Sequence, residues 1–228
     1  MSSLVTASNL INTWNLNGGS LDAAFVSTIE GLFVDINAVY SLSNISGLGD
    51  EAIILEDTNL AAIQLTTLDG ITSGVINAAS ITSLTGAAAD LNTAYDSAGI
   101  SNLGNEAVTL SDTTLAASVL NTLDGHTSGT IDAGTVSTLT GTAADLNTAY
   151  DSAGISNLGN EAVTLSDNSL NASVLNALDG RTSGAINAGS INTLSGTAAD
   201  LITAYAANGS GITDLGNEAV NVSSGSAS

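Results

Sequence analysis

The sequence predicts an α/β repeat solenoid built from about four 55-residue strand-helix-strand-helix repeats. The segment DSAGISNLGNEAVTLSD occurs at residues 96–112 and again, without a change, at 151–167, which sets the period at 55 residues. Each period alternates short β-forming segments with helix-forming segments. Neither kind of segment can bury its apolar face alone, so neighbouring repeats must stack.

The period covers the whole chain, so we expect a single repeat domain, 1–228, without a linker. It begins with a diverged partial repeat at 1–40, continues with full repeats at 41–95, 96–150 and 151–205, and ends in the start of a fifth repeat at 206–228. Residues 55 apart share a phase, and a two-residue insertion near Asn208 and Gly209 shifts the numbering after it. Four tyrosines share one phase: Tyr40, Tyr95, Tyr150 and Tyr205.

The first half of the period at 96–150 predicts a strand followed by a helix. EAVTLSD at 106–112 alternates apolar and polar residues, which is typical of a short strand. TTLAASVLNTL follows, with Asp112 as its expected N-cap and Asp124-Gly125 as its stop. The expected apolar face of this helix consists of Leu115, Val119, Leu120 and Leu123.

The second half predicts the same order again. GTIDA at 129–133 is the second expected strand, and Val136 and Leu139 after it should point inward. Thr142 and Asp145 have capping-box spacing at the start of AADLNTAYDSAG, a helix expected to end near Gly154. An all-helical array is the alternative, because the strand segments VTL and TID have only about three residues each.

Composition excludes several classes of function. One Lys or Arg, Arg181, stands against 22 Asp and Glu residues, for a formal charge of −21. Binding of nucleic acid or of an anionic membrane surface is therefore not expected, because both need cationic side chains. The chain has no Cys, which excludes disulfides and cysteine zinc sites. A hydrophobic content of 43% and a mean hydropathy of +0.33 predict a folded chain.

Targeting signals of the usual kinds are not predicted. No apolar run approaches the roughly 18 to 20 residues that span a bilayer, so no membrane insertion is expected. The opening MSSLVTASNLINTWNLNGG has neither a basic region nor a continuous apolar core. We therefore expect no classical signal peptide.

One segment suggests catalysis, but comparison between repeats argues against it. Asp124-Gly-His126-Thr-Ser128 brings a carboxylate, an imidazole and a hydroxyl together in sequence. The His126 phase holds Leu16, Ile71 and Arg181 in the other repeats, which indicates a tolerant, exposed turn position. The sequence therefore predicts a protein that is not an enzyme.

The recurring carboxylates have two readings. Rows of Asp and Glu near turns could bind Ca²⁺, which takes several oxygen ligands and is the candidate cofactor. The competing reading assigns Asp to helix caps and turns and Glu to solvated surface, and no EF-hand loop is present. The tyrosine row is expected to be a core ladder whose hydroxyls find partners at the coil edge. The metal candidates are Asp57, Asp112, Asp167, Glu51, Glu106 and Glu161.

Units such as EAVTLSDTTLAASVLNTLDGHTSGTIDAGTVSTLTGTAADLNTAYDSAGI resemble the tandem repeats of large, acidic cell-surface proteins of marine cyanobacteria and other bacteria. Those proteins are often labelled calcium-binding. The resemblance covers about residues 41–220. It implies an extracellular or cell-surface location with secretion that needs no classical leader.

The ends of the chain predict self-assembly. EAVNVSS at 218–224 is a surplus copy of a strand that the first repeat lacks. We expect this segment of one subunit to complete the first repeat of the next, which gives a head-to-tail homopolymer, a filament or surface layer. The alternatives are a monomeric adhesive or calcium-binding module and a phage virion appendage or decoration protein. The expected interface residues are Ala219, Val220, Val222, Leu4, Val5, Leu10 and Trp14.

Overall fold

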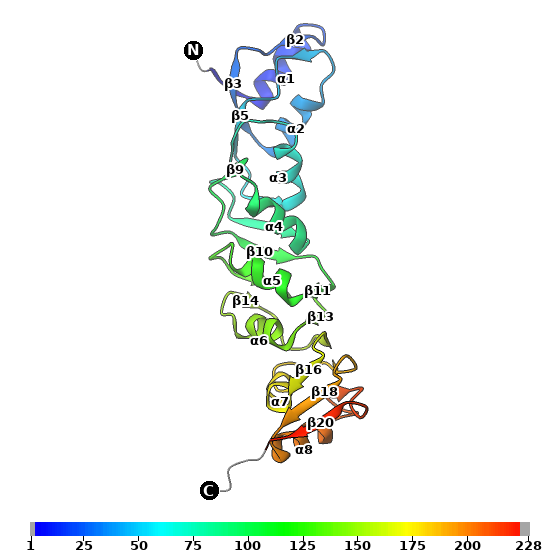
Figure 1. The fold of residues 1–228 in the computed structure, drawn as a ribbon. Helices are drawn as coiled ribbons and strands as arrows, with labels where there is room; N and C mark the ends of the chain where they lie inside the picture. Colours follow the sequence, from blue (N-terminus) through cyan, green and yellow to red (C-terminus); the bar gives the residue numbers. More distant parts are fainter. Residues whose placement is uncertain (1–2, 224–228) are drawn as a thin grey trace. The chain divides into compact units, whose positions relative to one another are not determined.

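The computed structural model describes residues 3–223 (Figure 1). Parallel strands alternate with helices in repeating units along this range, which confirms the α/β repeat solenoid and excludes the all-helical alternative. The helices are α1 Ala7–Leu16, α2 Phe33–Ser41, α3 Ala62–Asp69, α4 Ala88–Asp96, α5 Ala117–Asp124, α6 Ala143–Asp151, α7 Ala172–Asp179 and α8 Ala198–Ala207.

The strands are short, and several have only two residues. They are β1 Ser3–Thr6, β2 Leu21–Asp22, β3 Val26–Gly31, β4 Ile45–Ser46, β5 Ala52–Leu55, β6 Asn59–Ala61, β7 Ile76–Asn77, β8 Ser83–Gly86, β9 Ile100–Ser101 and β10 Ala107–Leu110. They continue with β11 Thr114–Ala116, β12 Ile131–Asp132, β13 Thr138–Gly141, β14 Ile155–Ser156, β15 Ala162–Leu165, β16 Ser169–Asn171, β17 Ile186–Asn187, β18 Thr193–Gly196, β19 Ile212–Thr213 and β20 Ala219–Val222.

The chain divides into two compact units. The first comprises Met1–Thr109 with His126–Gly129, and the second comprises Leu110–Gly125 with Thr130–Ser228. The first unit contains a five-stranded sheet of order β1-β3-β5-β7-β9 and a two-stranded sheet, β2-β4. The second contains a five-stranded sheet of order β11-β13-β15-β17-β19 and a three-stranded sheet, β16-β18-β20.

The strand register shows that one structural coil has about 24 residues. Thr114 pairs with Thr138, and Thr138 pairs with Ala162. Two such coils use 48 of the 55 residues in a sequence period. The remaining seven residues separate Ala107 from Thr114, the first residues of β10 and β11. Each period therefore starts a new sheet, displaced along the chain by one short connection.

A sheet consequently takes strands from two consecutive periods. In the second unit, β11 and β13 belong to the period that starts at Ala107, whereas β15, β17 and β19 belong to the period that starts at Ala162. The sequence separation between paired residues rises to 26 for Ile186 and Ile212, which confirms the two-residue insertion near Asn208. No single period can complete a sheet, so each depends on the next.

The helix predicted after Asp112 begins later than expected. Thr114–Ala116 forms β11, so the N-cap of α5 is Ala116 and not Asp112. Leu115 is accordingly a buried strand residue. Of the remaining predicted face, Leu120 and Leu123 are buried and Val119 is half-buried. The stop is confirmed, because α5 ends at Asp124 with Gly125 as its C-cap.

The second half of this period follows the prediction closely. Ile131 and Asp132 form β12, and Val136 and Leu139 are buried. The Thr142 hydroxyl accepts the Asp145 backbone N–H at 3.1 Å and caps α6 as expected. The helix ends at Asp151, with Ser152 as its C-cap, before Gly154 is reached.

Consecutive coils approach closely at one glycine in each period. A Cβ atom added at Gly74, Gly129 or Gly184 would overlap the backbone carbonyl of Glu51, Glu106 or Glu161, respectively. The φ angles of these glycines lie outside the left-handed region, so backbone conformation does not require glycine here. The close approach of another backbone does. The coil spacing therefore depends on this phase.

We expect Gly184→Ala to lower the free energy of unfolding by about 2 kcal/mol or more, since the new methyl group must displace backbone atoms in the adjacent coil. The matched control is Gly180→Ala, where the added Cβ meets no atom closer than 3.4 Å. Its effect should stay below about 1 kcal/mol. Urea unfolding followed by circular dichroism measures both, and equal effects would contradict the close-approach explanation.

Candidate functional site

A part-buried contact between tyrosine and glutamate recurs in every period. The Tyr95 hydroxyl donates to Glu106 Oε2 at 3.0 Å. The same contact joins Tyr40 to Glu51 at 2.8 Å, Tyr150 to Glu161 at 3.1 Å, and Tyr205 to Glu218. The expected hydroxyl partners of the tyrosine row are thus confirmed, and they are side chains that the sequence reading had placed on the solvated surface.

The glutamates of this contact are not solvated. Glu51, Glu106 and Glu161 are each 0% exposed. Backbone N–H groups add to the carboxylate's partners, as Gly104 and Asn105 donate to Glu106 Oε2 at 2.8 and 3.1 Å. The Thr127 hydroxyl, 21 residues later, donates to the Glu106 backbone carbonyl at 2.8 Å. We call each such set of Tyr, Glu and Thr a coil clamp.

The environment of the clamp keeps the tyrosine hydroxyls neutral. Burial, assisted by the neighbouring carboxylate, raises the pKa of Tyr40, Tyr95 and Tyr150 well above the ordinary value. The same causes raise the pKa of Tyr205 to about 12. Burial works against ionisation of Glu218, but hydrogen bonds from Tyr205 and from backbone N–H groups outweigh it and lower the pKa of that carboxyl.

Two of the predicted metal ligands are helix caps between coils. The Phe33 N–H, at the start of α2, donates to Asp57 Oδ2 at 2.6 Å, and the Ala143 N–H, at the start of α6, donates to Asp167 Oδ2 at 2.7 Å. Each aspartate therefore caps a helix that lies 24 residues earlier in the chain. Asp112 has the same phase and is half-buried. The capping interpretation was right, but the helix assigned to it was wrong.

The structure does not gather the candidate carboxylates into a metal centre. Glu51, Glu106 and Glu161 lie in coil clamps, and Asp57 and Asp167 accept helix N–H groups. Over residues 3–223, no group of three or more His, Asp or Glu side chains is placed to hold a metal ion, and no pocket is found. Calcium binding stays a prediction.

His126 is less exposed than a tolerant turn residue should be. Its ring stacks on Tyr95, with 5.5 Å between ring centroids and an interplanar angle of 6°. Nε2 lies 3.5 Å from Asp96 Oδ1, and the side chain is 24% exposed. The groups that accompany it in sequence have other partners, because Asp124 accepts the Ser152 hydroxyl and Ser128 donates to the Gly104 carbonyl. A non-catalytic role stays a prediction.

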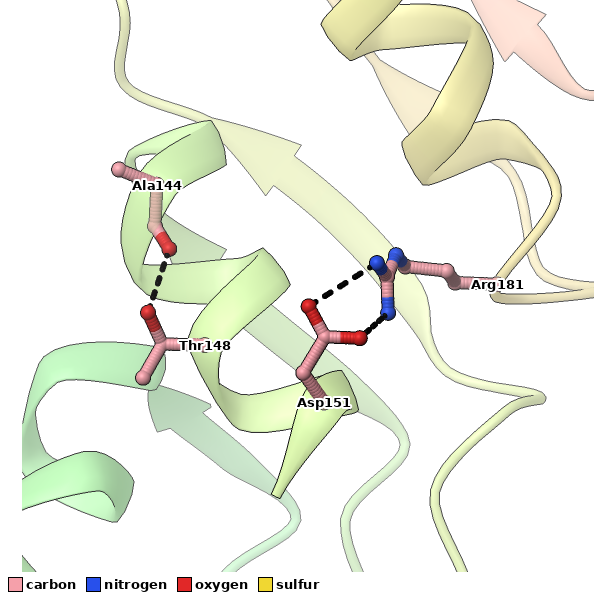
Figure 2. A network of polar contacts seen from close by, with 4 residues as sticks. All are labelled: Ala144, Thr148, Asp151 and Arg181. Carbon is pink, nitrogen blue, oxygen red and sulfur yellow. Dashed lines mark hydrogen bonds and ion pairs between the residues drawn. The ribbon is translucent and has the colours of Figure 1, made fainter.

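The same phase carries an ion pair one period later. Arg181 donates to both carboxylate oxygens of Asp151, with Nη2 and Oδ2 separated by 3.0 Å (Figure 2). On the same helix, α6, the Thr148 hydroxyl donates to the Ala144 carbonyl at 3.0 Å. Because Asp151 is 64% exposed, the pair adds at most about 1 kcal/mol to stability. The pair also shows that residues 30 positions apart in the sequence face each other at this phase.

The predicted interface residues divide into three groups. Leu4 is 54% exposed, Val220 45% and Val222 64%, and Ala219 is exposed as well. Val5 and Trp14 are half-buried, and Trp14 Nε1 donates to the Ser43 carbonyl at 2.9 Å. Leu10 is only 2% exposed, so its assignment to the subunit interface was wrong: it packs inside its own unit.

One feature near the N-terminus was missed by sequence reasoning: β2 pairs with β4 alone among the described strands. The exposed turn position expected at the phase of Leu16 is present there, since Leu16 is 87% exposed. The phase of β2 was a usable signal, because Leu21 is aligned with Ile76, Ile131 and Ile186, each of which lies in a strand.

Comparisons with known proteins add no family. No protein-family model, curated protein or solved structure matches the chain. No helix in the described range is both long enough and apolar enough to cross a membrane.

We expect the stability of the protein to fall above pH 10. Tyrosines of the unfolded chain ionise near that pH, while the folded chain holds Tyr40, Tyr95 and Tyr150 neutral and Tyr205 neutral up to about pH 12. The stabilisation is thus complete below pH 10 and is lost as pH rises.

The Tyr150→Phe variant tests this linkage. With one of four tyrosines removed, the slope of unfolding free energy against pH between 10 and 11.5 should be smaller by about a quarter. Urea midpoints measured at several pH values give that slope. A slope identical to that of the unsubstituted protein would contradict the assigned role of the buried hydroxyl.

Proposed function

We propose that this chain is a non-enzymatic structural protein whose copies join head to tail through β20 into an extracellular filament or surface layer. The main support for this proposal is the exposure of Val220 and Val222, at 45% and 64%. The equivalent residues in the earlier repeats of the chain are buried. Self-association of this chain would cover them.

The equivalent residues show what normally covers these phases. Ile53 and Leu55 in β5, Val108 and Leu110 in β10, and Val163 and Leu165 in β15 are each at most 3% exposed. Where both neighbours lie in one unit, β5 pairs with β3 and β7, and β15 pairs with β13 and β17. Among the described strands, β20 pairs with β18 alone. One strand edge and two large side chains therefore lack the cover that their counterparts have.

The energetics favour association but only modestly. Covering two partly exposed valines contributes about 1 kcal/mol each, and new strand hydrogen bonds add to this. The formal charge of −21 on each copy opposes association at low ionic strength. We therefore propose assembly that depends on salt. The resemblance to acidic tandem-repeat proteins of cell surfaces supports an extracellular location.

The variant Val222→Asp should abolish assembly, because it places a carboxylate where the next coil would bury an apolar side chain. The matched control is Val34→Asp, since Val34 is also 64% exposed but lies on α2 at the phase of Ala89 and Ala144, which are exposed in their own coils. Light scattering and electron micrographs of the purified chain provide the readout.

Circular dichroism melting checks that both variants fold. If Val34→Asp and Val222→Asp behave alike, β20 is not the contact surface. If the unsubstituted chain stays monomeric at tens of micromolar in physiological salt, the proposed function is wrong and a monomeric adhesive module takes its place.

Calcium at millimolar concentration should promote assembly more than NaCl at matched ionic strength, because a divalent ion can bridge carboxylates that monovalent salt only screens. Scattering measured against CaCl₂, MgCl₂ and NaCl tests this. Equal responses at equal ionic strength would mean general screening, and the proposed calcium role would then be dropped.

A further inference from the structure

We infer that the partner of β20 is β2 of a second copy, so that the sheets β16-β18-β20 and β2-β4 join into one five-stranded sheet. This inference rests on the proposed function and specifies its contact. It is carried by the order of the strands, by their register, and by two side-chain phases.

The strand order is the first argument. Two of the five-stranded sheets, β1-β3-β5-β7-β9 and β11-β13-β15-β17-β19, take strands of the same five phases in the same order. The sheet β16-β18-β20 has the first three of these phases, and β2-β4 has the last two. The two incomplete sheets are therefore complementary parts of the sheet that the chain forms elsewhere.

The register follows from the complete sheets. Val163 pairs with Ile186 and Thr164 with Asn187, and the equivalent pairs Ile53–Ile76 and Ile54–Asn77 lie in the other unit. Transferred to the junction, Val220 lies opposite Leu21 and Asn221 opposite Asp22.

The backbone hydrogen bond transfers in the same way. The Val163 N–H donates to the Ala185 carbonyl at 2.9 Å, and the Ile53 N–H donates to the Val75 carbonyl at 3.0 Å. At the junction, the Val220 N–H takes the donor's place and the Ser20 carbonyl takes the acceptor's.

A glycine phase agrees with this docking. Gly74, Gly129 and Gly184 each pack against the backbone carbonyl of a clamp glutamate in the preceding coil. Gly19 has the same phase, but its φ of +83° lies in the left-handed region, unlike theirs, and within its own copy an added Cβ would meet the ring of Trp14 at 3.3 Å. In the junction, Gly19 faces the Glu218 carbonyl of the second copy, where a larger residue would block the approach.

The ion-pair phase agrees as well. Residues 30 apart face each other in Asp96–His126 and Asp151–Arg181, and in both pairs a carboxylate lies beside a nitrogen-bearing side chain. The earlier pair at these phases, Ser41 and Ile71, has no charge on either side. At the junction, the pair is Ala206 of one copy with Leu16 of the next, both exposed in the single chain. This pair of phases therefore brings no charge to the junction.

Disulfide trapping tests the register, and the absence of native Cys gives a clean background. A copy with Asn221→Cys is mixed with a copy with Asp22→Cys and oxidised under assembly conditions. Paired residues on adjacent strands have Cα separations within disulfide range. A covalent dimer should form on a non-reducing gel, and each variant alone should give at least tenfold less.

The matched control pairs Asn221→Cys with Ser46→Cys. Ser46 lies on β4, pairs with Asp22 of β2, and is exposed. It is one strand farther from β20 than Asp22 is, so its Cα should lie about 10 Å from the Cα of Asn221. It should give no more dimer than the single variants. If the unsubstituted chain assembles and the two pairs crosslink equally, this register is wrong while the proposed function stands. If the unsubstituted chain does not assemble, both are wrong.

Discussion

The close approach of one coil to the next is the constraint on which the rest of the structure depends. It occurs where a glycine such as Gly129 meets the backbone carbonyl of a buried glutamate such as Glu106. Burying a carboxylate is costly unless donors reach it, and the tyrosine hydroxyl and backbone N–H groups of the clamp donate to Glu106 Oε2, whereas Glu106 Oε1 has no hydrogen-bond partner among the described residues. A chain with almost no cations thus buries acidic side chains without ion pairs. The same contact fixes the spacing at which strands of successive coils pair.

The sequence predicted the repeat but not the coil. Exact recurrence of residues 96–112 at 151–167 sets the sequence period, whereas the 24-residue coil is set by strand pairing between segments whose only likeness is very short. Thr114–Ala116 and Thr138–Gly141, for example, share just the dipeptide Thr-Leu. The strand β11 was read as part of a helix, because TTLAASVLNTL has helical spacing throughout. Pairing with β13 outweighed this local preference, and the helix begins only at Ala117.

The chemistry of the acidic rows was predictable in kind but not in partner. Capping was the right expectation for the Asp57 and Asp167 phase, yet the capped helix lies 24 residues back, a distance that only the coil length reveals. The burial of Glu106 could have been suspected from its fixed separation from Tyr95, since both recur in every period. His126 looked like a variable turn residue because one position was considered alone. Compared together with the residue 30 positions earlier, the phase places a carboxylate beside His126 or Arg181 in two periods and joins the uncharged Ser41 and Ile71 in another.

Copies of this chain should dock as one more coil, with the same strand order that the chain uses within itself. The decisive measurement is a reconstruction of the assembled protein by electron cryo-microscopy, at a resolution that separates strands. We expect it to place β20 between β18 of its own copy and β2 of the next, with Val220 and Val222 buried. Assemblies in which the outer edge of β20 faces solvent, and copies touch through the exposed faces of their helices, would contradict it.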